Sequence, residues 1–290
     1  MDCRMRSLKS VPQNIPSVIE ILNLSRNQIV NISEQVFSEN SNIKVLNLGK
    51  NRIEELPKNL FKSLSNMERI FLDTNKISKV LPGTFDGLYH LKSLEFSRNK
   101  LQALPRGIFD GNKKLKYLAL QCNSISSLPQ KLFDGLKLLE RLHLYSNRIT
   151  YIESRQFGNL SSLQYLTLHQ NKLFQLKNGV FSGLSHLKGF TLNNNNIVSI
   201  EDKVLNGLTE LMMLDMRHNG LSSLPPGFLS SLSIGMVRRV KLSDNPLVCS
   251  CQLFMEIKPL KDKIRGNGDR NVGISSMSAD YYCGLLMFSD

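Results

Sequence analysis

Apolar and polar positions follow one another in a fixed order along most of this 290-residue chain. Each copy of the pattern opens with L-x-x-L-x-L and continues with an asparagine, further aliphatic positions and a phenylalanine. In the fifth copy these positions are Leu115, Leu118, Leu120, Asn123, Ile125, Leu128 and Phe133. Alternation of leucine with other residues is typical of a short half-buried strand, whose leucines point inward. The pattern therefore predicts one short strand in each copy.

The asparagine of this pattern marks the repeat. It returns every 24 residues, at Asn27, Asn51, Asn75, Asn99, Asn123, Asn147, Asn171, Asn195 and Asn219. Such a period indicates a repeat protein, because one copy cannot bury its apolar face alone and neighbouring copies stack into a continuous core. Ten strands, the last around Val240, are expected to form a parallel sheet on the inner side of a curved solenoid. The asparagine amides are expected to form a buried hydrogen-bonded ladder without a binding role.

A second spine lies ten residues past each asparagine. It consists of Phe37, Phe61, Phe85, Phe109, Phe133, Phe157 and Phe181. Leu205 takes this place in the eighth copy, and Pro225, Pro226 and Phe228 shift the pattern in the ninth. Large aromatic rings contribute strongly to burial, so the row is predicted to be core on the convex side rather than a cofactor groove. No cofactor is expected.

The frame L-x-x-L-x-L-x-x-N-x-L-x-x-L-P resembles the leucine-rich repeat. The resemblance implies an α/β solenoid: a curved leucine-rich repeat horseshoe with a parallel concave sheet and a cysteine-bearing C-terminal cap. We expect a partial N-terminal cap over residues 1–18, the repeat solenoid over 19–245 and a C-terminal cysteine cap, incomplete here, over 246–290. The period and this cap are similar to those of extracellular members such as Toll-like receptors, variable lymphocyte receptors and Slit-type proteins.

The segment N-P-L-V-C-S-C carries Cys249 and Cys251, and Cys283 follows later. It resembles the extracellular C-terminal cap, which the family closes with two disulfides, the first cysteine to the third and the second to the fourth. The resemblance thus implies that Cys283 pairs either with Cys249 or with Cys251, and the first pairing is favoured. A zinc site built on these three residues lacks a fourth ligand at typical spacing.

At the other end, Cys3 and the residues after it look like the close of the matching N-terminal cap, and no secretory signal peptide precedes them. The expectation is a partial version of a longer secreted chain, and the alternative is a cytosolic protein with reduced thiols. Cys122 is interpreted as a small apolar filler in preference to a redox group. Glycosylation sequons begin at Asn23, Asn31 and Asn159.

The formal charge of +13 favours acidic partners, with acidic glycans among them. No nucleic-acid motif accompanies the charge, so nucleic acid is not favoured. The sequence has no apolar run that approaches the roughly 20 residues of a membrane helix. Cations on the predicted inner side outnumber Asp73, Glu95 and Asp215 there, and they would steer an acidic ligand inward. These cations are Arg69, Arg98, Lys100, Arg148, Lys172, Arg217, Arg239 and Lys241.

The fixed period allows the exposed columns of the sheet to be written out. The fifth to seventh copies place tyrosine, histidine and arginine in adjacent strands, which is the composition of a protein-binding hot spot. The predicted ligand-binding residues are Tyr117, Arg141, His143, Tyr145, Tyr165, His169, Phe71 and Arg69. Arg141 is expected to stack between the rings of Tyr117 and Tyr165. The two histidines have no nearby cysteine or carboxylate to complete a metal site.

The resemblance implies non-enzymatic recognition, and no catalytic motif opposes this. The leading hypothesis is the ectodomain of a secreted or cell-surface receptor in innate immunity or cell–cell communication, which binds a protein ligand on its concave face. One alternative is an extracellular-matrix protein that binds acidic polysaccharide through its basic face. The other is a cytosolic scaffold, which would require reduced cysteines.

Overall fold

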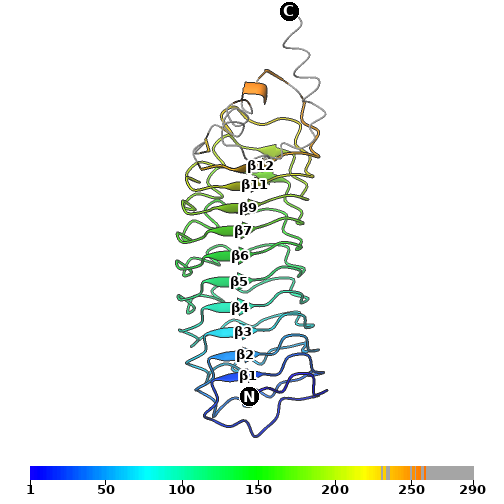
Figure 1. Ribbon diagram of the computed structural model, residues 1–290, viewed down its shortest axis with the longest axis vertical. Helices are drawn as coiled ribbons and strands as arrows, with labels where there is room; N and C mark the ends of the chain where they lie inside the picture. The colour runs from blue at the N-terminus through cyan, green and yellow to red at the C-terminus, as the bar shows by residue number, and fades with distance from the viewer. Residues whose placement is uncertain (230, 233–235, 249, 252, 256–257, 259–290) are drawn as a thin grey trace, which may run out of the picture. The chain divides into compact units, whose positions relative to one another are not determined.

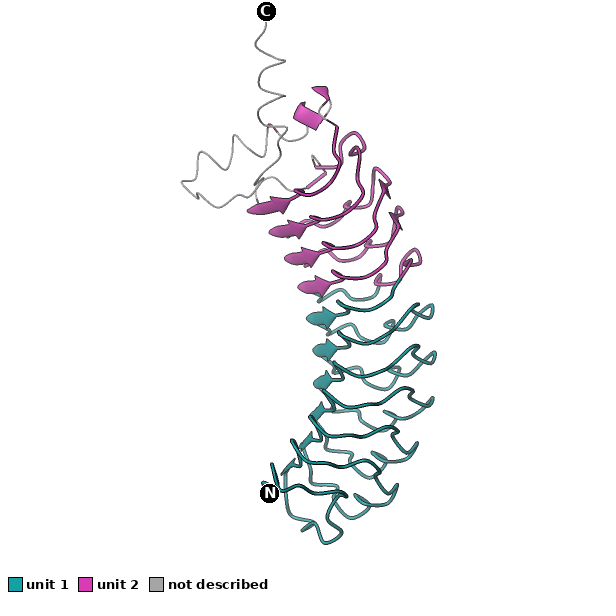
Figure 2. Ribbon diagram, turned by 90° about the vertical axis from the view of Figure 1, so that its right-hand side faces the viewer, with its two compact units in different colours: residues 1–149, 159–163 teal, residues 150–158, 164–290 magenta. Residues whose placement is uncertain are grey.

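The computed structural model describes residues 1–229, 231–232, 236–248, 250–251, 253–255 and 258. The chain divides into two compact units. Unit 1 comprises Met1–Ile149 and Asn159–Leu163, and unit 2 comprises Thr150–Gly158 and Gln164–Asp290. In each unit the strands lie along one side and the turns along the other (Figure 2). The described residues contain little helix, with helical backbone only at residues 251, 253–255 and 258.

Each repeat supplies one three-residue strand, as the leucine pattern predicts. The strands of unit 1 are β1 (Ile21–Asn23), β2 (Val45–Asn47), β3 (Arg69–Phe71), β4 (Ser93–Glu95), β5 (Tyr117–Ala119) and β6 (Arg141–His143). They pair in chain order, parallel, with each residue opposite the residue 24 positions later (Figure 1). Equivalent residues of successive repeats therefore form straight columns across the sheet.

Unit 2 continues the same scheme with β7 (Tyr165–Thr167), β9 (Gly189–Thr191), β11 (Met213–Asp215) and β12 (Arg239–Lys241), which also pair in parallel. The last pairing joins residues 26 apart, which accommodates the longer ninth repeat. Two further strands, β8 (Gln175–Leu176) and β10 (Ser199–Ile200), pair with each other in a separate two-stranded sheet. The leucine pattern did not predict this second sheet. The parallel leucine-rich repeat solenoid itself is confirmed.

The core is the stack of inward-pointing leucines and phenylalanines. The middle leucine or isoleucine of each strand in unit 1 is fully buried, and so is the phenylalanine spine. The ring of Phe85 stacks on Phe61 and Phe109, with centroid distances of 5.9 and 6.1 Å. Rings in this stacked arrangement contribute to stability beyond the area that they bury. The predicted role of the phenylalanines as core is confirmed.

The asparagine ladder satisfies backbone groups that the turn would otherwise leave unpaired. Asn75 shows the arrangement: its Nδ2 donates to the carbonyls of Leu72 and Leu48, both at 3.1 Å. Its Oδ1 accepts the amide of Ile53 at 3.0 Å. One side-chain amide thus makes one bond within its own repeat and two to the preceding repeat. These bonds stabilise the turn, because a buried backbone group without a partner costs free energy.

The residue before each ladder asparagine adopts a left-handed backbone. The φ angles lie between 52° and 57° at Arg26, Lys50, Thr74, Arg98, Cys122, Ser146, Gln170, Asn194, His218 and Asp244. This conformation is uncommon for residues other than glycine, yet it recurs at every turn because it carries the chain out of the strand. Cys122 occupies this position and is half-buried.

The first residues of the chain cover the open edge of β1. The amide of Cys3 donates to the carbonyl of Asn23 at 2.8 Å, and the amide of Asn23 donates to the carbonyl of Met1 at 3.0 Å. The Oδ1 of Asn27 accepts the amides of Arg6 and Leu8. This segment thereby takes the place of a preceding repeat, which protects a strand edge that would otherwise expose unpaired groups.

Two of the cysteines predicted to form disulfides, Cys249 and Cys283, lie outside the described residues. Cys251 is exposed, and Cys3, Cys122 and Cys251 form no disulfide among the residues described. The disulfide pairing therefore stays a prediction. Within the described part of the chain, no helix is long and apolar enough to cross a membrane.

Candidate functional site

The strand register builds a polar surface on each unit, which we call the strand face. It consists of the first and third residue of every strand and the residue two positions beyond the strand. The register confirms the columns that the repeat period predicts. Not every column member is exposed, however: Ser25, Ser97 and Asp215 are buried, and so are Ala119 and Gly189.

Three side chains of unit 1 form an aromatic cluster on this face: Tyr117 of β5, His143 of β6 and Tyr145 just beyond β6. The Tyr117 and His143 rings are 5.4 Å apart between centroids and tilted by 59°. The His143 and Tyr145 rings are 6.4 Å apart and meet edge to face at 79°. Edge-to-face contacts place the positive rim of one ring against the negative face of the other, which holds the rings in defined positions.

Glu95 of β4 anchors this cluster. The Tyr117 hydroxyl donates to Glu95 Oε2 at 3.1 Å. Ala119 lies between Glu95 and His143 in the strand register and is buried, so its small side chain leaves room for the Tyr117 ring. Burial, and then the negative charge of Glu95, raise the pKa of Tyr117 to about 12. The phenol is therefore protonated and oriented at neutral pH.

The predicted residues of unit 1 are only partly brought together. Arg141 begins β6, is exposed, and pairs in register with Tyr117. Arg69 and Phe71 lie on β3, separated from β6 by two strands, so they are on the same face but outside the aromatic cluster. The stacking of Arg141 between Tyr117 and Tyr165 stays a prediction.

In unit 2, Tyr165 lies against the backbone of Gly189. A Cβ atom added to Gly189 would lie 2.8 Å from Cδ1 of the Tyr165 ring and 3.2 Å from Cε1. Real Cβ atoms essentially never approach another heavy atom so closely, so the glycine is what allows this ring position. The sequence does place a glycine next to Tyr165 in the exposed column, but its role becomes visible only from the distance.

His169 of unit 2 is partly buried beside the next strand. Its Nδ1 lies 2.9 Å from the hydroxyl oxygen of Thr191. Burial lowers the pKa of His169, and the charge of Asp215 opposes this effect. The imidazole is therefore neutral near pH 7, which suits a hydrogen-bonding contact better than a charged one.

Asp215 changes the expected charge of this surface. Its side chain is 8% exposed and accepts two hydrogen bonds from the Arg217 guanidinium, at 3.0 and 2.8 Å, while Lys241 Nζ lies 3.9 Å away. Paired with the carboxylate, Arg217 and Lys241 contribute less attraction for an acidic ligand than a count of cations predicts. In unit 2, fewer basic residues are therefore available to attract an acidic ligand than the sequence predicts.

The chemistry available on the strand face is hydrogen bonding, aromatic contact and charge pairing. Among the residues that the structure describes, no three His, Cys, Asp or Glu side chains lie close enough to hold a metal ion. Asn31 and Asn159, two of the predicted glycosylation sites, are exposed, and Asn23 is half-buried. Their modification stays a prediction.

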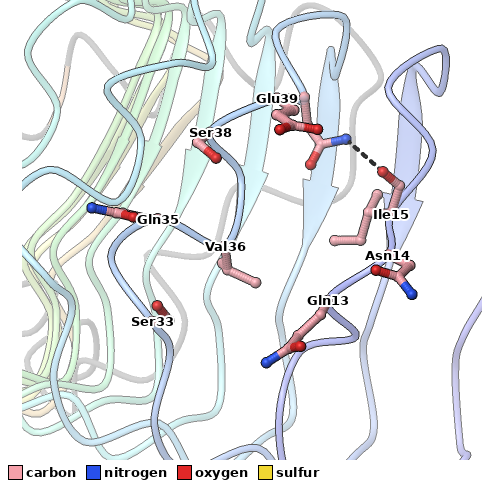
Figure 3. Close-up of a pocket in the computed structure, with 9 residues that line it drawn as sticks. Gln13, Asn14, Ile15, Ser33, Gln35, Val36, Ser38 and Glu39 are labelled. Atoms are coloured by element: carbon pink, nitrogen blue, oxygen red, sulfur yellow. Dashed lines mark hydrogen bonds between the residues drawn. The ribbon is translucent and has the colours of Figure 1, made fainter.

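A hollow that the repeat pattern did not predict lies near the N-terminal end of unit 1 and is lined by residues of connecting segments (Figure 3). Its volume is about 360 Å³, and it is lined by Gln13, Asn14, Ile15, Ser33, Gln35, Val36, Ser38, Glu39 and Asn40. Asn40 Nδ2 donates to the carbonyl of Ile15 at 3.2 Å across it. Amides and hydroxyls dominate this lining and Glu39 is its one ionisable group, so we assign it no function.

Comparison with known proteins identifies the family. The model of the leucine-rich repeat matches residues 17–77, 65–121, 113–173, 166–221 and 185–247. These spans cover most of the chain, which belongs to the leucine-rich repeat family. Solenoids of this family are typically binding modules. No curated protein matches the chain.

Solved structures of the same fold include several receptors. The chain is similar to TLR13 in the TLR13–ssRNA13 complex, with 26% identity and a TM-score of 0.71, over 82% of this chain and 35% of that one. It is also similar to a chain of the octameric complex of Latrophilin 3, Unc5D and FLRT2, in which FLRT2 carries the repeats. There the identity is 28% and the TM-score 0.74, over 89% of this chain and 85% of that one.

A third structure, the Drosophila Toll–Spatzle complex, is 21% identical with a TM-score of 0.70, over 85% of this chain and 41% of that one. This similarity shows the fold alone. The chain spans well under half the length of the TLR13 and Toll chains that it matches.

Proposed function

We propose that the chain is a recognition module whose strand face binds a protein ligand, with the aromatic cluster of Tyr117, His143 and Tyr145 at the centre of the contact. The observation that carries this proposal is the hydrogen bond between Tyr117 and Glu95, which fixes a large amphipathic ring before any ligand arrives. Rigid aromatic side chains bury much area at little conformational cost, which is why tyrosine is frequent at interface hot spots.

The surrounding residues extend this contact. Arg141 adds an exposed guanidinium next to Tyr117, and Arg69 and Phe71 add charge and apolar area further along the face. Tyr165 and His169 are the corresponding contacts that we propose on unit 2. A fixed parallel sheet suits a protein ligand, since its columns form a broad surface instead of a closed cavity. The complex that contains FLRT2, in which the matching chain is 28% identical to this protein, also contains two other proteins, Latrophilin 3 and Unc5D.

We further propose that the module is the ectodomain of a secreted or cell-surface receptor, in innate immunity or cell–cell communication. The similarity to TLR13 and FLRT2 supports this assignment. The proposed ectodomain consists of a partial N-terminal cap over residues 1–18, the solenoid of residues 19–245 and a C-terminal cysteine cap over residues 246–290. In this proposal Cys283 pairs with Cys249 or Cys251, and Asn23, Asn31 and Asn159 carry glycans.

The ligand proposal is tested by using the chain as bait against a panel of secreted and cell-surface proteins from the source cells. For a protein that binds, Tyr117→Ala and Tyr145→Ala are each expected to weaken affinity by tenfold or more, a loss of about 1.4 kcal/mol or more. Tyr89→Ala is the matched control, because Tyr89 is an exposed tyrosine of unit 1 on a turn. Equal affinity for all four proteins would refute a role of the cluster.

The location proposal is tested by non-reducing peptide mapping of the protein recovered from its source cells. We expect Cys283 to be linked to Cys249 or Cys251, with sugar on Asn31 or Asn159. Five free thiols and no sugar would place the chain in a reducing compartment and favour a cytosolic scaffold.

A further inference from the structure

Unit 1 carries a row of cations at the edge of its strand face, which we call the basic edge. It consists of Arg26, Lys50 and Arg98, at the left-handed turn position, and Arg52 and Lys100, two residues further along the repeat. All five are exposed. They belong to two neighbouring columns that contain no aspartate or glutamate within unit 1.

The backbone holds these residues in register. The amides of Arg26, Lys50 and Arg98 donate to carbonyls of the next repeat at 3.0, 2.8 and 2.9 Å. The amides of Arg52 and Lys100 donate to carbonyls of the preceding repeat, at 2.9 and 2.8 Å. Each cation therefore rises from a fixed point, and members of adjacent repeats stand about 4.8 Å apart.

Other cations of unit 1 are neutralised within the sheet. Lys44 lies 2.7 Å from Glu20, Lys92 lies 3.0 Å from Glu68, and Lys116 lies 2.8 Å from Glu140. In these pairs the acid occupies the same column one repeat away, because equivalent residues of neighbouring repeats are in contact.

The basic edge lacks this compensation. Among the described residues, none of its five cations forms an ion pair, and Lys76 between them lies 3.6 Å from Glu54. Like charges held close together repel one another, so the row is maintained at some cost to folding. A ligand with a matching line of negative charge would remove that repulsion.

The basic edge has no aromatic residues, and this distinguishes between two possible ligands, single-stranded nucleic acid and sulfated polysaccharide. Proteins that bind single-stranded nucleic acid combine a basic path with aromatic rings on which bases stack. The two columns of the basic edge contain no phenylalanine, tyrosine or histidine within unit 1. Sulfated sugars need charge pairing without stacking, and arginine can bind a sulfate through two parallel N–H donors as it does a phosphate.

We propose that the basic edge of unit 1 is a binding site for sulfated polysaccharide. The chain of sugars would run across the repeats, so that successive sulfates meet the cations of successive turns. This site is separate from the aromatic cluster and does not depend on the protein ligand proposed above.

Heparin is the probe for this site. The quadruple variant Lys50→Asn, Arg52→Gln, Arg98→Asn and Lys100→Gln removes four charges, and asparagine tolerates the left-handed backbone at the two turn positions. We expect it to elute from immobilised heparin at clearly lower salt than the wild type and to bind a heparin oligosaccharide at least about tenfold more weakly at about 0.15 M salt. The dependence of affinity on salt should also become less steep, because fewer counterions are released.

The matched control is the variant Lys58→Gln, Lys62→Gln, Lys113→Gln and Lys114→Gln, which loses the same net charge from exposed turns of unit 1. It is expected to retain most of the affinity. An equal loss in both variants would mean that net charge alone attracts heparin, and that result would overturn the proposed site. Circular dichroism establishes that both variants are folded.

Two further probes test whether the site recognises sulfate groups and whether it prefers polysaccharide to nucleic acid. Heparin stripped of its sulfates should bind far more weakly, and a single-stranded RNA of equal charge should bind more weakly than heparin. Tighter binding of the RNA would overturn the choice of polysaccharide. Tyr117→Ala should leave heparin affinity unchanged, so this site and the protein-binding face can each fail without the other.

Discussion

The ring of Tyr165 rests on the backbone of Gly189, in the neighbouring strand of unit 2 and in direct register with it. Any side chain at Gly189 would meet the ring, because an added Cβ would lie 2.8 Å from Cδ1. The glycine has the ordinary extended backbone of a strand. It is needed here because it has no side chain, and not because of its conformational freedom. An exposed aromatic ring on the strand face thus owes its orientation to the smallest residue of the next repeat.

Gly189→Ala is expected to displace the Tyr165 ring and to lower the free energy of unfolding by about 1–2 kcal/mol. Tyr165→Ser combined with Gly189→Ala should recover most of that loss, since the clash no longer exists. A double-mutant cycle from urea unfolding measures this coupling. Additive effects of the two substitutions would show that the ring does not rely on the glycine.

Asn75→Ala is expected to destabilise the solenoid by about 3 kcal/mol, because three hydrogen bonds to buried backbone groups are lost at once. The amide of Ile53 loses its partner, whereas the carbonyls of Leu48 and Leu72 keep Asn51 and Asn99. Asn66→Ala is the control: Asn66 also donates to the preceding repeat, at the carbonyl of Ser41, but is exposed. Its replacement should change the free energy of unfolding by less than about 0.5 kcal/mol. Similar losses in the two variants would contradict the role assigned to the ladder.

Glu95→Gln is expected to lower the pKa of Tyr117 from about 12, because the carboxylate no longer repels the phenolate. Burial remains, so the pKa should stay above the ordinary value of 10. The measurement is an absorbance or NMR titration of tyrosine ionisation, with Tyr117→Phe to assign the signal. An unchanged pKa would mean that burial alone sets it, and that Glu95 does not hold the ring.

His169 makes stability depend on pH in a defined direction. Its pKa in the folded protein lies below 6.5, so on acidification the unfolded chain binds a proton before the folded one does. Stability is therefore retained above pH 6.5 and lost as the pH falls from 6.5 towards the folded pKa. His169→Gln can still bond to Thr191 and should flatten this part of the profile, measured as Tm against pH. An identical profile in the variant would exclude His169 as the cause.

Much of the architecture could be predicted from the repeat. The positions of the ten strands, the phenylalanine core and the asparagine ladder follow from a 24-residue period that places the same residue type at the same point of each turn. The columns of the strand face could be predicted for the same reason. The partial N-terminal cap over residues 1–18 was expected from the resemblance and not from the period. The pair β8 and β10 was not evident, because the leucine pattern does not specify the backbone of the segments between the main strands.

The sequence by itself determined which residues share a column, since every turn of the solenoid has the same backbone and only the count of residues matters. The tertiary structure decided how those side chains use the space: Tyr117 bonded to Glu95, Tyr165 seated on Gly189, and Asp215 buried between two cations. Each of these depends on the size and charge of particular neighbours: Glu95, Gly189 and Lys241 lie one repeat away, and Arg217 lies two residues from Asp215. A period describes what the repeats have in common, whereas recognition depends on the positions at which they differ.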